Sequence, residues 1–118
     1  MNENSITTLC KDVKKWAEEK KAEDIKVYDV RGRLDYTDYI IICSAIGDLH
    51  LKAIAEYILE NAKKEKIKIY GSEGVNEGKW ALIDLGDVIL HIFVKKTRKY
   101  YNLEDFIEDF KDIKRKAE

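Results

Sequence analysis

Histidine and cysteine are scarce in this sequence, and their spacing leaves little room for metal or redox chemistry. The chain of 118 residues has two histidines, His50 and His91, and two cysteines, Cys10 and Cys43. They form no H-x-x-x-H or C-x-x-C pair, the local spacings by which zinc sites and redox motifs are recognised. We therefore predict neither a metal nor another cofactor. Both cysteines are interpreted as buried, reduced thiols that pack as small hydrophobes.

Other absences narrow the class of protein further. No run approaches the roughly 20 apolar residues of a membrane span, and the first residues do not read as a signal peptide, so a cytoplasmic protein is expected. The 22 basic and 23 acidic residues nearly cancel, to a net charge of -1. A protein whose main task is to grip nucleic acid needs an excess of Lys and Arg. The balance argues against that task, although not against a local basic patch.

The residues that are present fit one globular domain. About 45% are apolar, enough for a single core, and we expect the domain to span residues 1–110, with a frayed tail at 111–118. Apolar periodicity predicts helices over 5–20, from Asp48 to about Ala62, and from Leu103 to Phe110. Strands are predicted at 25–30, 39–45, 67–70, 79–84 and 87–94. The order α-β-β-α-β-β-β-α predicts an α/β fold in which helices pack on a mixed five-stranded sheet.

Particular residues predict how these elements begin and connect. Residues 39–45 are apolar on both faces, which is typical of a central strand. Asp48 should be the N-cap of the second helix, and Asn102 that of the last helix, with Asp105 at the third helical position. The segment 84–87 (Asp-Leu-Gly-Asp) predicts a hairpin in which Gly86 takes a positive φ.

An enzymatic alternative depends on Gly71-Ser72 followed by Asp84 and Asp87, a pattern faintly similar to nucleotidyltransferases. Two aspartates that share a metal from one strand should be two residues apart, so that both side chains leave the same face. Asp84 and Asp87 are three apart and flank a turn, where Asp is common. The glycine-rich segment 71–78 is also a poor phosphate cradle, because it has no P-loop lysine, carries two acidic residues and leads into a strand. A mobile connecting loop that contacts a partner is the simpler interpretation.

Aromatic and basic residues provide the remaining candidates. Trp80 belongs either to the core or to a protein interface, where Trp is over-represented among hot spots. His91 alternates with apolar neighbours, which favours a structural or interface histidine over a catalytic base. The basic cluster is followed by Tyr100 and Tyr101, a combination that can bind RNA. A solvated strand end, with the tyrosines packed under the last helix, is the preferred interpretation. The cluster comprises Lys95, Lys96, Arg98 and Lys99.

A series of short motifs gives the chain a specific resemblance from about Asp24 to Phe106. It resembles the Iojap or ribosomal silencing factor family, and the order and spacing of the whole series carry the resemblance. The motifs are Asp29-Val30-Arg31-Gly32, Thr37-Asp38-Tyr39, Lys52-Ala53-Ile54-Ala55, Gly71-Ser72-Glu73-Gly74, Glu77-Gly78, Trp80-Ala81-Leu82-Ile83-Asp84, Gly86-Asp87-Val88 with His91 and Phe93, and Arg98-Lys99-Tyr100-Tyr101-Asn102-Leu103-Glu104.

The resemblance implies a fold and a function. The family fold is a small α/β domain, similar to nucleotidyltransferases but without their catalytic aspartates. Family members bind the fourteenth protein of the large ribosomal subunit, on the face that meets the small subunit, and so block subunit joining and damp translation. Organellar relatives assist large-subunit assembly, and free family members often form homodimers. The resemblance thus implies a binding protein, not an enzyme.

Site residues follow from the matching positions. Trp80, Asp84 and Asp87 match a W-x-L-x-D-x-G-D stretch, which implies a docking surface, and Thr37, Asp38 and Tyr39 match a second signature. Glu73 and Glu77 would add acidic contacts to a basic ribosomal protein, and the basic cluster would add a minor contact to ribosomal RNA. Two segments depart from the family pattern. Gly47-Asp48-Leu49-His50 puts an arginine contact there in doubt, whereas Phe106-Ile107 is interpreted as a core substitution.

Overall fold

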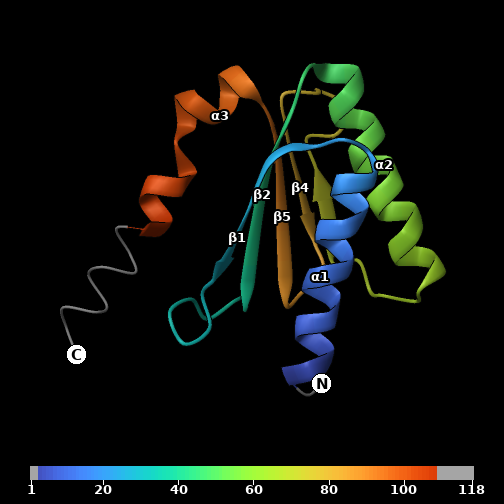
Figure 1. The fold of residues 1–118 in the computed structure, drawn as a ribbon, viewed down its shortest axis with the longest axis vertical. Helices are drawn as coiled ribbons and strands as arrows, with labels where there is room; N and C mark the ends of the chain where they lie inside the picture. Colours follow the sequence, from blue (N-terminus) through green and yellow to red (C-terminus); the bar gives the residue numbers. More distant parts are fainter. Residues whose placement is uncertain (1–2, 109–118) are drawn as a thin grey trace.

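A five-stranded mixed sheet forms the centre of the computed structural model, which describes residues 3–108 (Figure 1). The strands lie in the order β1-β2-β5-β4-β3, and only the central pair, β2 and β5, is parallel. The predicted α/β class and the order of elements are confirmed. The strands are β1 (Glu23–Asp29), β2 (Tyr39–Ala45), β3 (Gly71–Glu73), β4 (Trp80–Asp84) and β5 (Val88–Val94).

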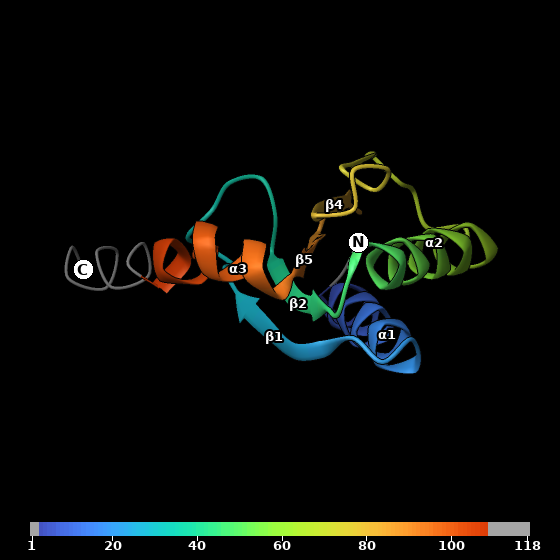
Figure 2. The same cartoon turned by 90° about the horizontal axis from the view of Figure 1, so that it is seen from above.

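Helices α1 (Glu3–Glu19) and α2 (Asp48–Lys64) lie side by side on one face of the sheet (Figure 2). The apolar stripes predicted for them pack there against alternate residues of the central strands, and both cysteines are free and buried in this layer. Burial raises the pKa of Cys43 to about 12, so its thiol is the protonated form at neutral pH. The fully buried strand predicted at 39–45 is confirmed, with the predicted bounds.

The opposite face of the sheet has a smaller helical cover. Helix α3 (Lys95–Tyr101) follows β5 directly, and residues 103–108 form a further helical segment. In Figure 2, α3 lies on the other side of the sheet from α1 and α2. The cluster beneath it joins residues of β1 and β2 to Ile107, so the cover is concentrated at the β1 side. On this face the β4 side chains Trp80 and Leu82 are half-buried, whereas Ile89, His91 and Phe93 of β5 are buried.

The predicted strand at 67–70 is wrong in its bounds, because the paired strand is β3, at 71–73. Two hydrogen bonds end α2 here: Lys66 N–H donates to the Lys63 carbonyl at 3.1 Å, and Ile67 N–H to the Ala62 carbonyl at 2.8 Å. Lys66 takes the left-handed φ of 58° that this kind of helix end requires. The N–H of Ile67 is therefore unavailable to a strand. The first part of the glycine-rich segment, predicted as a loop, is instead this strand.

Two predicted helix boundaries also need correction. Asp48 is the first residue of α2, and the N-cap is Gly47, which makes no side-chain cap. The Asp48 carboxylate instead accepts a hydrogen bond from the Leu49 N–H, at 2.9 Å. The basic segment predicted as a solvated strand end is the helix α3. Its C-cap is Asn102, whose side-chain amide donates to the Asp105 carboxylate at 2.7 Å, so Asn102 lies between two helices.

The predicted hairpin is confirmed. Strands β4 and β5 are antiparallel, and Gly86 has a φ of 84°. Among residues 3–108, no helix combines the length and the apolar content needed to cross a bilayer. The predicted domain end at residue 110, the tail 111–118 and the core position Phe110 lie outside the described residues.

Candidate partner-binding face

Alternation along β4 and β5 creates the candidate site. Side chains two residues apart in a strand leave the same face, and the register pairs Trp80 with Phe93 and Leu82 with His91. These four residues lie on the face opposite α1 and α2, together with Ile89. We call the surface of β4 and β5 formed by Trp80, Leu82, Ile89, His91 and Phe93 the open face.

Trp80 is the centre of an aromatic cluster on the open face. Its ring stacks on Phe93, with centroids 4.8 Å apart, and is tilted against Tyr101, also at 4.8 Å. Its indole Nε1 donates a hydrogen bond to Nδ1 of His91 at 3.0 Å. Trp80 is half-buried, so it is neither sealed in the core nor free in solvent. A ring that is held rigidly and still presents one side is suited to anchor a partner.

His91 serves this cluster as a structural residue. It is buried, and burial lowers its pKa to about 4, so the ring is neutral near pH 7. The hydrogen bond from Trp80 requires an unprotonated Nδ1, which fixes the tautomer with its proton on Nε2. The prediction of a structural or interface histidine agrees with this arrangement.

An apolar groove of about 140 Å³ continues the open face toward the last helical segment. Its floor comes from β2, β4 and β5, and its rim includes Tyr36 and Phe106, whose side chains are 65% and 64% exposed. The two exposed rings adjoin the apolar groove, and a continuous apolar surface of this kind marks a candidate interaction surface. The lining residues are Val30, Leu34, Tyr36, Ile40, Leu82, Ile89, His91, Leu103, Phe106 and Ile107.

The two predicted glutamates lie near one end of this surface. Glu73 of β3 pairs directly opposite Leu82 of β4 and is exposed. Glu77 lies in the connecting loop and lines a groove that also contains Trp80. Glu77 and Trp80 thus line one groove, and Glu73 lies on the neighbouring strand opposite Leu82. Lys79 and Lys96 line the same groove as Glu77, so this end of the surface carries charges of both signs.

The predicted aspartates lie elsewhere. Asp84 is at the opposite end of β4 from Trp80, and its carboxylate accepts a hydrogen bond from the Gly86 N–H at 2.8 Å, as expected for a turn. The backbone carbonyl of Asp87 accepts from the N–H groups of both Asp38 and Tyr39, at 3.1 and 3.0 Å. Asp38, Asp84 and Asp87 thus belong to the end of the sheet where β4 turns into β5. Within residues 3–108, no three His, Cys, Asp or Glu side chains are grouped as metal ligands.

Thr37 and Tyr39 are both buried. The Thr37 hydroxyl donates to the Tyr39 carbonyl at 3.3 Å. The Tyr39 ring packs in the cluster under α1 and α2, on the other side of the sheet from the open face. Arg31 lies over this ring, with its guanidinium carbon 5.3 Å from the centroid. Thr37 and Tyr39 therefore shape the start of β2, with both side chains largely enclosed by the fold.

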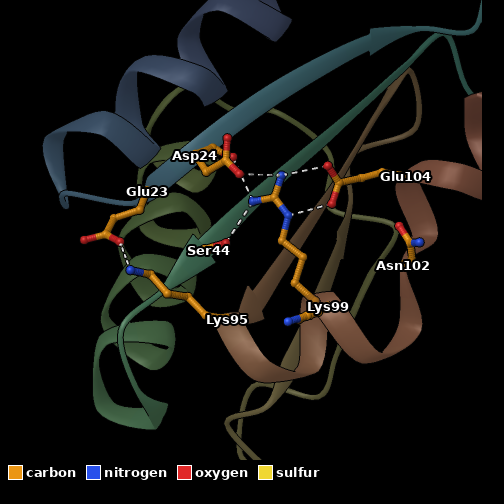
Figure 3. A pocket seen from close by; sticks show the side chains of 8 residues that line it. Glu23, Asp24, Ser44, Lys95, Lys99, Asn102 and Glu104 are labelled. Atoms are coloured by element: carbon orange, nitrogen blue, oxygen red, sulfur yellow. Dashed lines mark hydrogen bonds and ion pairs between the residues drawn. The ribbon is translucent and has the colours of Figure 1, made fainter.

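Two members of the basic cluster, Arg98 and Lys95, are engaged by polar and acidic groups of the fold. Arg98 is buried, and its guanidinium donates to both carboxylate oxygens of Glu104, to the Asp24 carbonyl and to the Ser44 hydroxyl. Lys95 forms an ion pair with Glu23. Figure 3 shows Asp24, Ser44 and Glu104 pointing toward a common centre, with Lys95 beside Glu23. Arg98 is therefore a structural residue. The RNA-binding interpretation of the basic cluster needs a free guanidinium at this position, and the fold already occupies it.

Arg98 and Glu104 shift each other's pKa in the direction that keeps both side chains charged. Hydrogen bonds from Arg98 lower the pKa of Glu104. Burial alone would lower the pKa of Arg98, but Glu104 and Asp24 outweigh it and raise that pKa.

The expectation that the tyrosines pack under the last helix is wrong, because Tyr100 is 81% exposed and Tyr101 55% exposed.

Sequence reasoning did not identify the floor and rim of the open-face groove or the Arg98–Glu104 pair. Strand alternation did contain part of the signal, since Trp80 and Leu82 are two apart, as are Ile89, His91 and Phe93. The contributions of Tyr36, Leu103 and Phe106 come from distant loops and helices, which no periodicity predicts.

The fold and this face together define the class: a small mixed α/β domain with two long helices on one sheet face and a smaller helical cover on the other. The family model described as "Ribosomal silencing factor during starvation" matches residues 3–118. The chain belongs to this family of ribosomal silencing factors.

Known relatives agree with this assignment. Ribosomal silencing factor RsfS of Bacillus subtilis is 39% identical over 104 residues, which cover 88% of this chain and 86% of the relative. The chloroplastic protein Iojap of Zea mays is 37% identical over 92 residues, 78% of this chain and 40% of that protein. The mouse "Mitochondrial assembly of ribosomal large subunit protein 1" is 33% identical over 92 residues, 73% of this chain and 39% of its own.

Solved structures show the same architecture. A crystal structure from Bacillus halodurans superposes with a TM-score of 0.79 at 34% identity, covering 85% of this chain and 93% of the other.

Proposed function

We propose that this protein binds the large ribosomal subunit through its fourteenth ribosomal protein and blocks the small subunit by occupying its contact site, so that translation is repressed. The observation that carries the proposal is the open face, in a chain that belongs to the ribosomal silencing factors. Trp80 anchors this face, and an apolar groove with exposed Tyr36 and Phe106 continues it.

Charge supports a basic protein as the partner of this face. Glu73 and Glu77 border it, and both are exposed. Opposite charges at the border of an apolar contact speed encounter and fix orientation more than they add affinity. Ribosomal proteins are commonly basic because they contact RNA phosphates. A basic ribosomal protein would thus be guided by Glu73 and Glu77 and held by the apolar floor of the groove.

Obstruction, not catalysis, is the mechanism we propose. Nδ1 of His91, the candidate general base, already accepts a hydrogen bond from the Trp80 indole N–H, and burial lowers the pKa of His91 to about 4. The Asp84 carboxylate is occupied in the hairpin turn. Neither group is needed for the proposed function beyond shaping the surface. Of the predicted site residues, we assign docking to Trp80, Glu73 and Glu77, and we assign to Asp38, Asp84 and Asp87 the border at the other end of β4.

Sedimentation of purified ribosomal subunits tests the proposal directly. The wild-type protein should lower the fraction of joined ribosomes and co-sediment with large subunits. Phe106→Glu places a charge on the groove rim and should restore joining. Leu49→Glu makes the same kind of change at an exposed position on the first turn of α2, where Leu49 is 76% exposed, and it should behave as wild type. An unchanged joined fraction at saturating wild-type protein would refute the proposal.

The name of the mouse relative favours a second role in large-subunit assembly. In that case depletion of the protein would accumulate assembly intermediates of the large subunit, and blocked joining would be a consequence. Gradient profiles of depleted cells separate the two roles. If depleted cells lose silencing but keep a normal level of large-subunit precursors, obstruction of joining is the role that remains.

The apolar rim of the groove is exposed to solvent in the free protein, and association of two copies would cover it. We propose a homodimer in which the open faces of two copies cover each other and which dissociates when the ribosomal partner binds. Analytical ultracentrifugation should then show a dimer that Phe106→Glu converts to a monomer. A wild-type monomer at high concentration would exclude this arrangement.

A further inference from the structure

A second groove lies between residues of the segment 74–80 and helix α3. Its volume is about 640 Å³, within the roughly 300–1,000 Å³ of sites that bind small organic groups. We call it the aromatic groove; it shares Trp80 and Glu77 with the docking surface proposed above, whereas its lysines and tyrosines have no part in that docking. The lining residues are Gly74, Glu77, Lys79, Trp80, Val94, Lys96, Thr97, Tyr100 and Tyr101.

Three aromatic rings form a continuous series along the aromatic groove. Trp80 and Tyr101 have centroids 4.8 Å apart, and Tyr101 and Tyr100 have centroids 5.1 Å apart in an edge-to-face arrangement. Tyr100 is 81% exposed and Tyr101 is 55% exposed. Core packing does not account for either side chain. Rings presented to solvent in this way offer platforms on which another flat group can stack.

The cations of α3 fall into two groups, those held in ion pairs and those without one among the described residues. Lys95 and Arg98 are held in ion pairs with Glu23 and Glu104. Lys96 and Tyr100 are four residues apart, so they share the side of the helix that lines the aromatic groove. For Lys79, Lys96 and Lys99 the structure gives no ion pair within residues 3–108, and all three are exposed.

The local charge is positive, although the whole chain carries a net charge of -1. Lys79 and Lys96 line the aromatic groove, and Glu77 is the one acidic residue that lines it. The two lysines outnumber Glu77 in this groove and favour an anionic ligand there. Flexible cations beside stacking platforms match a ligand that alternates phosphates with planar rings.

We propose that the aromatic groove binds single-stranded RNA, with an unpaired base stacked on the exposed ring of Tyr100 and the flanking phosphates held by Lys96 and Lys79. A single strand fits because its bases are free to leave their neighbours and stack on protein rings. Paired bases inside an A-form duplex cannot reach the tyrosines. Stacking accepts every base, so we expect little dependence on sequence.

Fluorescence anisotropy with labelled ten-nucleotide oligouridylate and oligoadenylate tests this proposal, with an RNA duplex of equal length as the competing probe. Tyr100→Ala should weaken binding of the single strands by about fivefold or more. Lys96→Ala should weaken binding and lower the slope of log affinity against log salt by about 0.7. Two matched controls, Tyr70→Ala and Lys63→Ala, remove an exposed ring and an exposed cation outside the aromatic groove and should bind as wild type.

Each outcome decides the matter. The proposal is overturned if the wild type binds neither oligonucleotide, if the duplex binds as tightly as the single strands, or if Tyr100→Ala binds as wild type. It is also overturned if Tyr100→Ala and Lys96→Ala lower affinity for the isolated ribosomal protein alone, because the aromatic groove is then a protein contact. Subunit joining measured on the same variants keeps the two ideas apart: wild-type protein that blocks joining without binding RNA would refute only this inference.

Discussion

The indole Nε1 of Trp80 donates a hydrogen bond to Nδ1 of His91, 3.0 Å away, and so joins neighbouring strands β4 and β5 on the open face. The bond exists only while Nδ1 of His91 is unprotonated. Burial reinforces this state by lowering the pKa of His91 to about 4. The orientation of the proposed anchor therefore depends on the protonation of one buried side chain.

Acid should destabilise the protein through His91. In the unfolded chain His91 has an ordinary pKa of about 6.5, so the unfolded state binds the extra proton between pH 6.5 and 4. The contribution to the free energy of unfolding is present above pH 6.5 and is lost as the pH falls toward 4. It amounts to about 3 kcal/mol. Urea denaturation at several pH values measures it.

His91→Asn is the matched variant for that experiment, because its side-chain oxygen can still accept the Trp80 indole proton but does not titrate. Its stability should change little between pH 7 and 5. Asp29 and Glu104 also have lowered pKa values, caused by hydrogen bonds from Arg31 and Arg98. These carboxylates lose their contribution only at lower pH, so the interval above pH 5 reports His91. An equally steep profile in the variant would contradict the assignment.

Arg98 and Glu104 should form the main attachment of α3 and the last helical segment to the sheet. Their side chains are 8% and 17% exposed, with Nε to Oε1 at 2.7 Å. Removal of one member of a largely buried ion pair leaves the other charge unpaired, at a cost of about 3–5 kcal/mol. Arg98→Ala and Glu104→Ala should each lower the free energy of unfolding by that amount. Denaturant titrations measure it.

A double-mutant cycle isolates the pair itself. The double variant should be clearly less destabilised than the sum of the two single variants, because neither charge is then left alone. Lys64→Ala, which removes an exposed i,i+4 pair with Glu60, should change stability by less than about 0.5 kcal/mol. Additive losses at Arg98 and Glu104 would show that the contact contributes no coupling.

The sequence predicted best those elements whose environment is uniform along the chain. Residues 39–45 are apolar at nearly every position, and β2 is buried on both faces over these same residues. The hairpin at 84–87 was predicted because its turn depends on local residues. Helix α3 was missed because its contacts are remote: Arg98 bonds to Asp24 and Ser44, which are 74 and 54 residues away in sequence.

The site was predicted only in part, for a similar reason. Trp80 and Asp84 share one sequence motif, but four residues of strand separate their backbones by about 13 Å. Trp80 lies at the aromatic end of the open face and Asp84 in the hairpin turn. Burial of Tyr39 under α1 and α2 could not be deduced from its motif. Which side of the sheet a strand residue faces is set by how the helices pack.

Gly74 should determine the position of the loop beside Trp80. Its φ is 78°, and an added Cβ would lie 1.9 Å from the Trp80 carbonyl oxygen. Gly74→Ala therefore has to move the backbone and adopt a strained φ, at a cost of about 1–3 kcal/mol. Gly71→Ala is the control, since an added Cβ there meets nothing within 4 Å. Thermal denaturation of the two variants should differ clearly, and equal midpoints would contradict the role of Gly74.

Trp80→Ala should weaken docking to purified large subunits by about 2–4 kcal/mol, as expected for a buried aromatic anchor at an interface. The loss combines the ring itself with the disorder of its neighbours, because Phe93 and Tyr101 both pack on it. Trp80→Phe keeps a ring for stacking but removes the donor to His91, so its affinity should be intermediate. Leu49→Ala, at a position that is 76% exposed and outside the open face, should bind as wild type. Co-sedimentation gives the affinities, and circular dichroism establishes that each variant is folded. A folded Trp80→Ala protein with wild-type affinity would place the docking surface elsewhere on the molecule.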